Sequence, residues 1–254
     1  MLRTADKRLF ASGQLSDIFG GSFKPLPSRM RHKLPVTTNL LAWYDASDLA
    51  TITDAGSGAV SAWADKSGNG YTLTEATNRP TTGTRSQNGL NVIDFDGTND
   101  IISSSCPADD LTSTSFIVAK TDSFASGHGS LYGSNGNQGE FLGVNTSGSF
   151  NGEYQSVLNS VVAFFGPGTS NPFAVCQRWN GPTDVSIISN VTQDGNNTGS
   201  GSTFTAGRTL VLGGRSTSNT LDGWIGEFLR FSAPLSQRDV WSVLAYLIDK
   251  WAIA

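Results

Sequence analysis

The sequence has little material for most kinds of catalysis or metal binding. In 254 residues it contains two histidines and two cysteines, and charged residues make up only 15% of the chain. His32 and His128 stand far apart, one in a basic segment and the other in a Gly-rich stretch. A Ser-His-Asp centre therefore has few candidate residues, and a zinc site has fewer. We expect a protein that is not an enzyme.

Long apolar runs are also absent. No segment approaches the roughly 20 apolar residues of a membrane span, and the longest candidate, near the C-terminus, contains Asp249 and Lys250. Residues 1–8 do not lead into an apolar signal-peptide core, so we expect no Sec export. Cys106 and Cys176 fall in different predicted strands. We expect two buried free thiols, while a single disulfide bond stays open as an alternative.

Turn-forming residues are abundant instead. The 29 glycines and the many Ser, Thr and Asn residues indicate numerous turns between short strands. In residues 88–102, Val92, Ile93 and Phe95 have strand-type side chains, and Asp96-Gly97 supplies a tight turn before apolar residues resume. A loop is predicted to start at residues 79–81. Further strands are predicted at residues 40–46, 60–64, 115–120, 140–144, 161–165, 173–179, 185–189, 209–212 and 223–231.

This spacing of short strands favours an all-β sandwich of two antiparallel sheets. The chain ends in its only convincing helix, with Ser236 as N-cap and Asp239 three residues later. Trp241 and Tyr246 lie off the apolar face and would contact a partner or cover a sheet edge. The apolar face, which must dock on the sheet, consists of Val240, Leu244, Leu247, Ile248 and Trp251. The strand tryptophans are expected in the core: Trp43, Trp63, Trp179 and Trp224.

Residues 1–37 differ from the rest of the chain. They carry seven Lys or Arg against two Asp, a net charge of +5, so residues 38–254 carry −9 of the total of −4. This arm shows no sustained period, and we expect it to become ordered only by gripping neighbouring subunits. Wrapping around its own domain is the alternative, and nucleic-acid binding is disfavoured because stacking aromatics are not interleaved with the basic residues. The predicted apolar anchors of the arm are Leu9, Phe10, Ile18, Phe19 and Phe23.

Several short motifs follow in a set order. They are Leu41–Ala46, Trp63–Gly70, Ile93–Asp100, Leu212–Gly214, Gly223–Glu227, and Leu235-Ser236 before a helix that ends Tyr246–Trp251. Together they resemble the laminin-G-like, concanavalin A-like lectin/glucanase jelly roll over about residues 38–254. The resemblance implies two antiparallel sheets of roughly six or seven strands each, the concave one often carrying ligands. Forms with such a closing helix occur in bacterial surface proteins and in bacteriophage structural proteins.

The resemblance also identifies sites to test. Catalytic glucanases of this fold place two glutamates and an aspartate on one strand, whereas this chain has only four glutamates, each in a different segment. Glycoside hydrolysis by that route is disfavoured. For a glycan, Tyr132 and Tyr154 are the candidate contacts, since both lie in Gly/Ser/Asn-rich surroundings.

Calcium is the one candidate cofactor that the resemblance implies, because several relatives of this fold bind it. Oxygen ligands could come from Asp94, Asp96, Asn99 and Asp100. The same residues are ordinary in a tight turn, and the EF-hand spacing is missing. We therefore expect no cofactor, with calcium as the alternative.

A lectin-type fold, no export signal and a basic arm with apolar anchors fit one biological setting. We expect a bacteriophage virion structural protein, assembled in the host cytoplasm as a head decoration, fibre or tail component. The arm would dock on capsid, portal or tail subunits, and the chain would form a homo-oligomer. Residues 38–254 would face outward, with host surface polysaccharide as a candidate ligand. The alternatives are a free carbohydrate-binding module or lectin and, third, a polysaccharide hydrolase.

Overall fold

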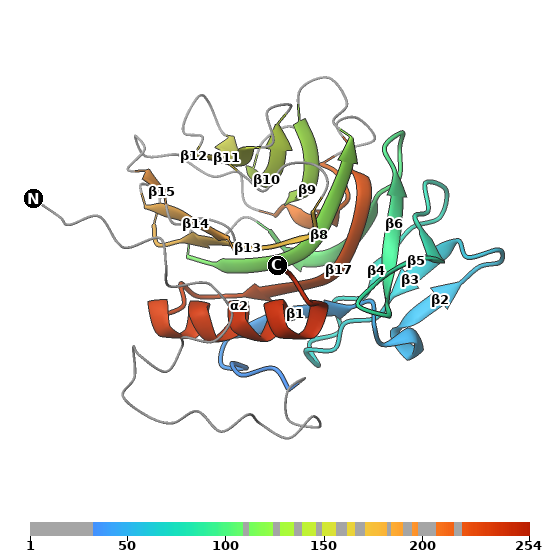
Figure 1. Cartoon of the computed structure of the whole chain (residues 1–254), viewed down its shortest axis with the longest axis horizontal. Coiled ribbons are helices and arrows are strands. Elements are labelled where there is room, and N and C mark those ends of the chain that lie inside the picture. The colour runs from blue at the N-terminus through green and yellow to red at the C-terminus, as the bar shows by residue number, and fades with distance from the viewer. Residues whose placement is uncertain are drawn as a thin grey trace, which may run out of the picture. The chain divides into compact units, whose positions relative to one another are not determined.

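A computed structural model of the chain describes residues 33–108, 112–123, 128–134, 139–145, 149–155, 162–165, 171–181, 184–189, 195–197, 207–215 and 220–254. All of these except Lys33 belong to one compact unit that begins at Leu34. Two antiparallel sheets lie face to face, and helix α2 (Gln237–Trp251) covers the outer face of one of them (Figure 1). The predicted all-β sandwich with a C-terminal helix is confirmed. The predicted anchors of the arm lie outside the described residues.

The first sheet, sheet A, is built around the long strand β17 (Asp222–Phe231). One edge of β17 pairs with β8, while its other edge is shared: β6 pairs with residues 222–225 and β1 with residues 227–231. Sheet A therefore forks at this edge of β17, with β6 on one branch and β1 on the other. The order is β15 (Gly195–Asn197), β14 (Val185–Ser189), β13 (Phe173–Trp179), β8 (Thr114–Ser123), β17, β6 (Leu90–Asp96) and β5 (Thr81–Gln87), with β1 (Leu40–Asp45) beside β17.

The second sheet, sheet B, has nine strands against eight in sheet A, more than the resemblance implies. Its order is β12 (Val162–Phe165), β11 (Ser149–Gln155), β10 (Gly139–Asn145), β9 (His128–Ser134), β16 (Thr209–Leu212), β7 (Ile102–Pro107), β4 (Leu73–Thr74), β3 (Val60–Trp63) and β2 (Ile52–Asp54), the last preceded by the short helix η1 (Leu49–Thr51). The loop predicted from residue 79 onward is wrong: Thr81–Gln87 pairs with β6 as an edge strand. Such a strand needs no apolar face, which is why its sequence reads as a loop.

Sheet A is buried on both faces. Along β17, Ile225 and Phe228 point into the core between the sheets, whereas Trp224 and Leu229 belong to a second core beneath α2. Trp63 and Trp179 are also buried, as predicted, and Trp43 is half-buried at the edge of the second core. The packing of α2 thus makes sheet A the middle layer of three (Figure 1).

Both cysteines are free and buried, as predicted. Cys106 lies between the sheets and Cys176 lies in the core beneath α2, so sheet A separates them. Burial raises the pKa of the Cys106 thiol to about 12. A thiol in this environment stays protonated and unreactive at neutral pH.

Helix α2 begins as its sequence predicts. The Ser236 hydroxyl accepts a hydrogen bond from the Asp239 amide at 3.2 Å. Most of the predicted apolar face is buried, while Ile248 is partly buried. Tyr246 is buried as well, at 6% exposure, so within this chain it is an internal contact, while Trp241 is 37% exposed. Within the described part of the chain, no helix is both long and apolar enough to cross a membrane.

Candidate functional site

The two tyrosines predicted to contact a glycan lie in neighbouring regions of sheet B. Tyr132, on β9, is 1% exposed, and its ring packs against Phe228 between the sheets. Its hydroxyl contacts Glu140 and Gln177. A ring in this position faces the core and offers no surface on which a sugar could stack. Tyr154 lies on β11 opposite Glu140, and its side chain is outside the described part of the structure.

The residues considered for calcium form the tight turn between β6 and β7. Asp96 accepts bonds from the amides of Thr98 and Asn99, and Asp100 accepts one from the Asp96 amide. Asp94 instead pairs with Arg85 at 3.0 Å. Among the described residues, no three His, Cys, Asp or Glu side chains come together in a way that could hold a metal ion. The carboxylates act here as turn and ion-pair partners.

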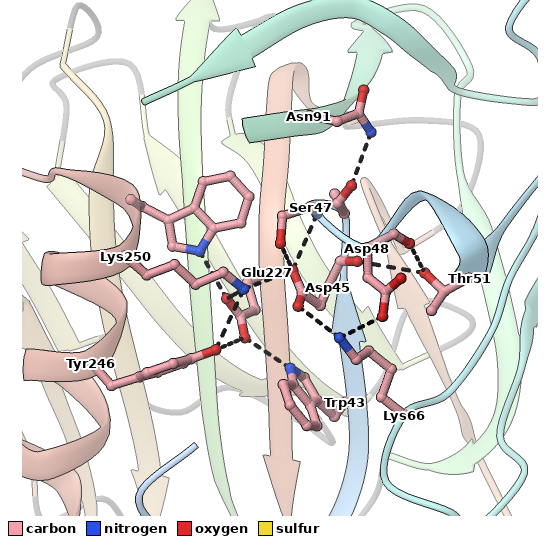
Figure 2. A network of polar contacts seen from close by, with 12 residues as sticks. Trp43, Asp45, Ser47, Asp48, Thr51, Lys66, Asn91, Glu227, Tyr246 and Lys250 are labelled. Carbon is pink, nitrogen blue, oxygen red and sulfur yellow. Dashed lines mark hydrogen bonds and ion pairs between the residues drawn. The ribbon is translucent and has the colours of Figure 1, made fainter. Parts of the chain in front are cut away.

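A polar network occupies the fork between β6 and β1, beneath the end of α2 (Figure 2). Its centre is Glu227, which is fully buried and accepts four hydrogen bonds. Burial raises the pKa of Glu227, and the nearby Lys250 ammonium opposes the rise. The donors come from β1 and α2: Trp43 Nε1 at 2.8 Å, Tyr246 hydroxyl at 2.9 Å, Lys250 Nζ at 2.7 Å and Trp251 Nε1 at 2.8 Å.

The same network reaches the surface through two aspartates. Lys250 also pairs with Asp45 at 2.7 Å, and Lys66 lies 2.9 Å from both Asp45 and Asp48. Burial alone would raise the pKa of Asp45, but Lys250, Ser47 and Lys66 together lower it. Lys66 also lies 4.6 Å from the centre of the Trp43 ring. Because each of these groups has a partner within the protein, the network holds α2, β1 and β17 together and leaves no vacant position for a substrate.

A second buried charge pair lies between the sheets. Arg230 Nη2 is 2.8 Å from Glu140 Oε2, and both residues are at most 1% exposed. Arg230 also donates to the Ser115 hydroxyl at 3.0 Å. Glu140, on β10 of sheet B, therefore points into the space between the sheets, whereas Glu227 lies on the outer face of sheet A. The two glutamates cannot act as the paired carboxylates of a glycosidase.

The outer face of sheet B carries an arginine stacked on an aromatic ring. Phe141, Gly133 and Val211 lie opposite one another on neighbouring strands, and Arg215 lies 4.4 Å from the centre of the Phe141 ring. A Cβ atom on Gly133 would be 2.6 Å from Arg215 Cγ, so a larger residue here would displace the Arg215 side chain. Phe141 and Val211 are both buried, at 1% and 3% exposure.

A cavity of about 310 Å³ that is open to solvent lies on the outer side of sheet A, where β13 meets the start of α2. Arg178 and Asn180 line it from β13 and the following turn, and Pro234, Leu235 and Ser236 line it from the segment that enters α2. The sequence predicts the strand, but Arg178 is not among the predicted site residues. The available signal is a single cation in a strand whose other residues, apart from Gln177, are apolar.

Comparison with known proteins shows which solved structures share this fold. No protein-family model matches the chain, and a search of curated proteins finds no match. Solved structures do match, at identities of 11% to 16%. Trypanosoma rangeli sialidase in complex with the inhibitor DANA covers 91% of this chain with a TM-score of 0.60. The match covers 36% of the sialidase, so this chain spans about a third of that protein.

Two further matches are separate binding domains. Domain 4 of AbnA, a GH43 extracellular arabinanase from Geobacillus stearothermophilus, was solved in complex with arabinotriose; the match has a TM-score of 0.55 and 12% identity, and covers 82% of this chain and 98% of that domain. The botulinum neurotoxin serotype G binding domain matches with a TM-score of 0.57 and 11% identity, over 83% of this chain and 51% of that one. The chain shares the β-sandwich fold of these proteins. At this identity the likeness concerns the fold alone.

Proposed function

We propose that the β-sandwich is a non-enzymatic carbohydrate-binding module. The observation that carries the proposal is the match to domain 4 of AbnA: nearly the whole of that domain, solved with arabinotriose bound, corresponds to this sandwich. Glu140 and Glu227 are each held by partners from their own chain and lie on opposite sides of sheet A, which supports binding without hydrolysis.

A glycan array of the purified chain tests this function. The expected result is selective binding of one group of glycans, with no sugar released from the bound ligands on prolonged incubation. A chain that binds nothing on a broad array would contradict the module, and release of sugar would contradict its non-enzymatic character.

We further propose that the module is displayed on a bacteriophage virion and is anchored by residues 1–37. What supports this setting is the charge division of the sequence: an arm of net +5 with five apolar anchors precedes an acidic body of −9. Deletion of residues 1–32 leaves Leu34 in the core beneath α2, so the shortened chain should fold. It should also fail to enter particles, which quantitative immunoblotting of purified virions would measure. Incorporation at the level of the full chain would rule out anchoring by the arm.

A further inference from the structure

We propose that the cavity where β13 meets the start of α2 binds a carboxylated sugar unit, with Arg178 holding the carboxylate. The proposal rests on the carbohydrate-binding function proposed above, and gives it a location and a ligand class. The site lies on the outer side of sheet A, away from the Arg215 face of sheet B.

Arg178 differs from three other cations of the described structure that have lost much of their water. Arg230, Lys250 and Lys66 each have a carboxylate within 2.9 Å. Arg178 is half-buried, yet no carboxylate of the described residues lies within ion-pair distance. Its contacts are the Leu235 carbonyl at 3.3 Å and the Ser186 hydroxyl at 3.4 Å, and its Nε atom is buried without an acceptor.

A partly desolvated guanidinium held by two long bonds retains most of its capacity to bind an anion. Neutral oxygens compensate poorly for the loss of hydration of a full charge. The planar fork of arginine matches a carboxylate, which can accept two parallel N–H bonds from it. The cavity next to Arg178 gives such an anion room to approach.

The other residues that line the cavity favour a sugar over a small inorganic anion as the ligand. The volume of about 310 Å³ is at the lower end of small-molecule sites, about 300–1,000 Å³. Pro234 and Leu235 offer apolar surface to the C–H groups of a sugar ring, and the Asn180 amide can bond to its hydroxyls. Asn180 is held in place by Asp184 at 2.9 Å.

The acidic neighbours of the cavity limit the charge of the ligand. Asp184 bonds to Asn180, and Asp239 bonds to the Ser236 hydroxyl at 2.7 Å, so both carboxylates flank the lining. A dianion would meet more repulsion from these groups than a single carboxylate. A uronic acid unit combines one carboxylate with hydroxyls and an apolar ring face, and is the ligand that fits.

The test compares two sugars that differ only at C6: methyl β-glucuronide, which has a carboxylate, and methyl β-glucoside, which has a hydroxymethyl group. Isothermal titration and NMR of the full chain would measure both, with acetate as competitor. We expect the glucuronide to bind at least tenfold more tightly than the glucoside and more tightly than acetate. Equal binding of the two sugars, or of glucuronide and acetate, would overturn the proposal.

Three variants locate the site. Arg178→Ala should weaken glucuronide binding about tenfold to a hundredfold, as expected for the loss of a charge-assisted pair. Asn180→Asp leaves Arg178 in place but replaces the amide that donates to Asp184 with a carboxylate at the exposed wall of the cavity. It should also weaken glucuronide binding, by tenfold or more, and its melting curve shows whether the fold is retained. Arg238→Ala, which removes an exposed cation from α2 outside the cavity lining, should have no effect.

The variants distinguish a wrong location of the binding site from a wrong function. If an array shows glycan binding that survives both Arg178→Ala and Asn180→Asp but is lost in Arg215→Ala, the ligand binds on sheet B: the location proposed here is wrong and the carbohydrate-binding function stands. If the array shows no binding at all, the function itself fails. Melting curves of each variant, matched to that of the unchanged chain, exclude loss of fold as the cause.

Discussion

A buried carboxylate such as Glu227 is stable only when hydrogen-bond donors replace the water that it has lost. Four donors from Trp43, Tyr246, Lys250 and Trp251 do so here (Figure 2). The fit also depends on Gly226, the preceding residue, because a Cβ atom there would be 2.9 Å from the Trp251 ring. Residues far apart in sequence thus form one structural unit.

We expect Glu227→Gln to lower the free energy of unfolding by about 3 kcal/mol, since Lys250 loses a charged partner and two of the four donors face the amide NH2 group, which cannot accept a hydrogen bond. Urea unfolding at neutral pH would measure the loss. Asp249→Asn is the control: Asp249 is an exposed neighbour on the same helix, and its replacement should change stability by less than about 0.5 kcal/mol. A loss of similar size in both variants would contradict a specific role for Glu227.

Asp100 predicts a pH dependence of stability. Burial raises its pKa to about 6, with Asp96 and Asp94 contributing repulsion. A carboxyl whose pKa is higher in the folded than in the unfolded chain contributes stability when protonated, and this stability is lost as the pH rises through about 6. Asp100→Asn keeps an oxygen that can accept from the Asp96 amide. We expect it to be more stable than the unchanged chain above pH 7, by on the order of 2 kcal/mol, and nearly equal to it near pH 4.

Urea midpoints at three pH values between these limits would measure the difference. A difference that stays constant over the range would show that Asp100 does not titrate in this way.

At the scale of the element, α2 is the part that the sequence predicts most fully. We expect Ser236→Ala to lower the free energy of unfolding by about 1 kcal/mol, because the Asp239 amide loses its capping acceptor. Ser242→Ala is the matched control, since the Ser242 hydroxyl donates to the Arg238 carbonyl within the helix and caps nothing. Thermal unfolding of both variants would measure the effect, and equal melting temperatures would contradict a stabilising cap.

Strand prediction succeeds where a strand has an apolar face and a turn on each side. The predicted bounds of β13, β14 and β16 agree with the structure for this reason. β9 and β11 are not predicted because their sequences are rich in Gly, Ser and Asn, and the sequence of β5 predicts a loop because it is a polar edge strand. Their pairing partners, not their own propensities, make them strands.

The polar sites were less predictable still. The Glu227 network joins residues from 43 to 251, and no local pattern shows that their side chains converge. Tyr132 was expected to be exposed because of its Gly- and Ser-rich neighbours, yet β9 turns its ring inward. In the sequence, Arg178 is an ordinary charged residue of a strand. Only the structure shows that it has no carboxylate partner among the described residues and that it lies beside a cavity.

At the scale of the whole molecule, the buried layers and the net charges are found in different regions of the chain. Sheet A is buried on both faces and bears α2, while the arm holds the excess of positive charge and the body the excess of negative charge. Opposite charges on two parts of one chain favour association between copies, as well as docking on other acidic surfaces. The strength of such contacts falls with ionic strength.

We therefore expect the full chain to form oligomers at low salt and residues 33–254 to remain monomeric, as measured by light scattering after gel filtration. A variant with Phe10, Phe19 and Phe23 replaced by Ser keeps the charge of the arm but loses most of its apolar anchors. If the anchors hold the copies together, this variant should dissociate at high salt while the full chain does not, because apolar burial is insensitive to screening. A full chain that is monomeric at low salt would show that the arm does not join copies of this protein, and docking on a different partner would then be the remaining use for its charge.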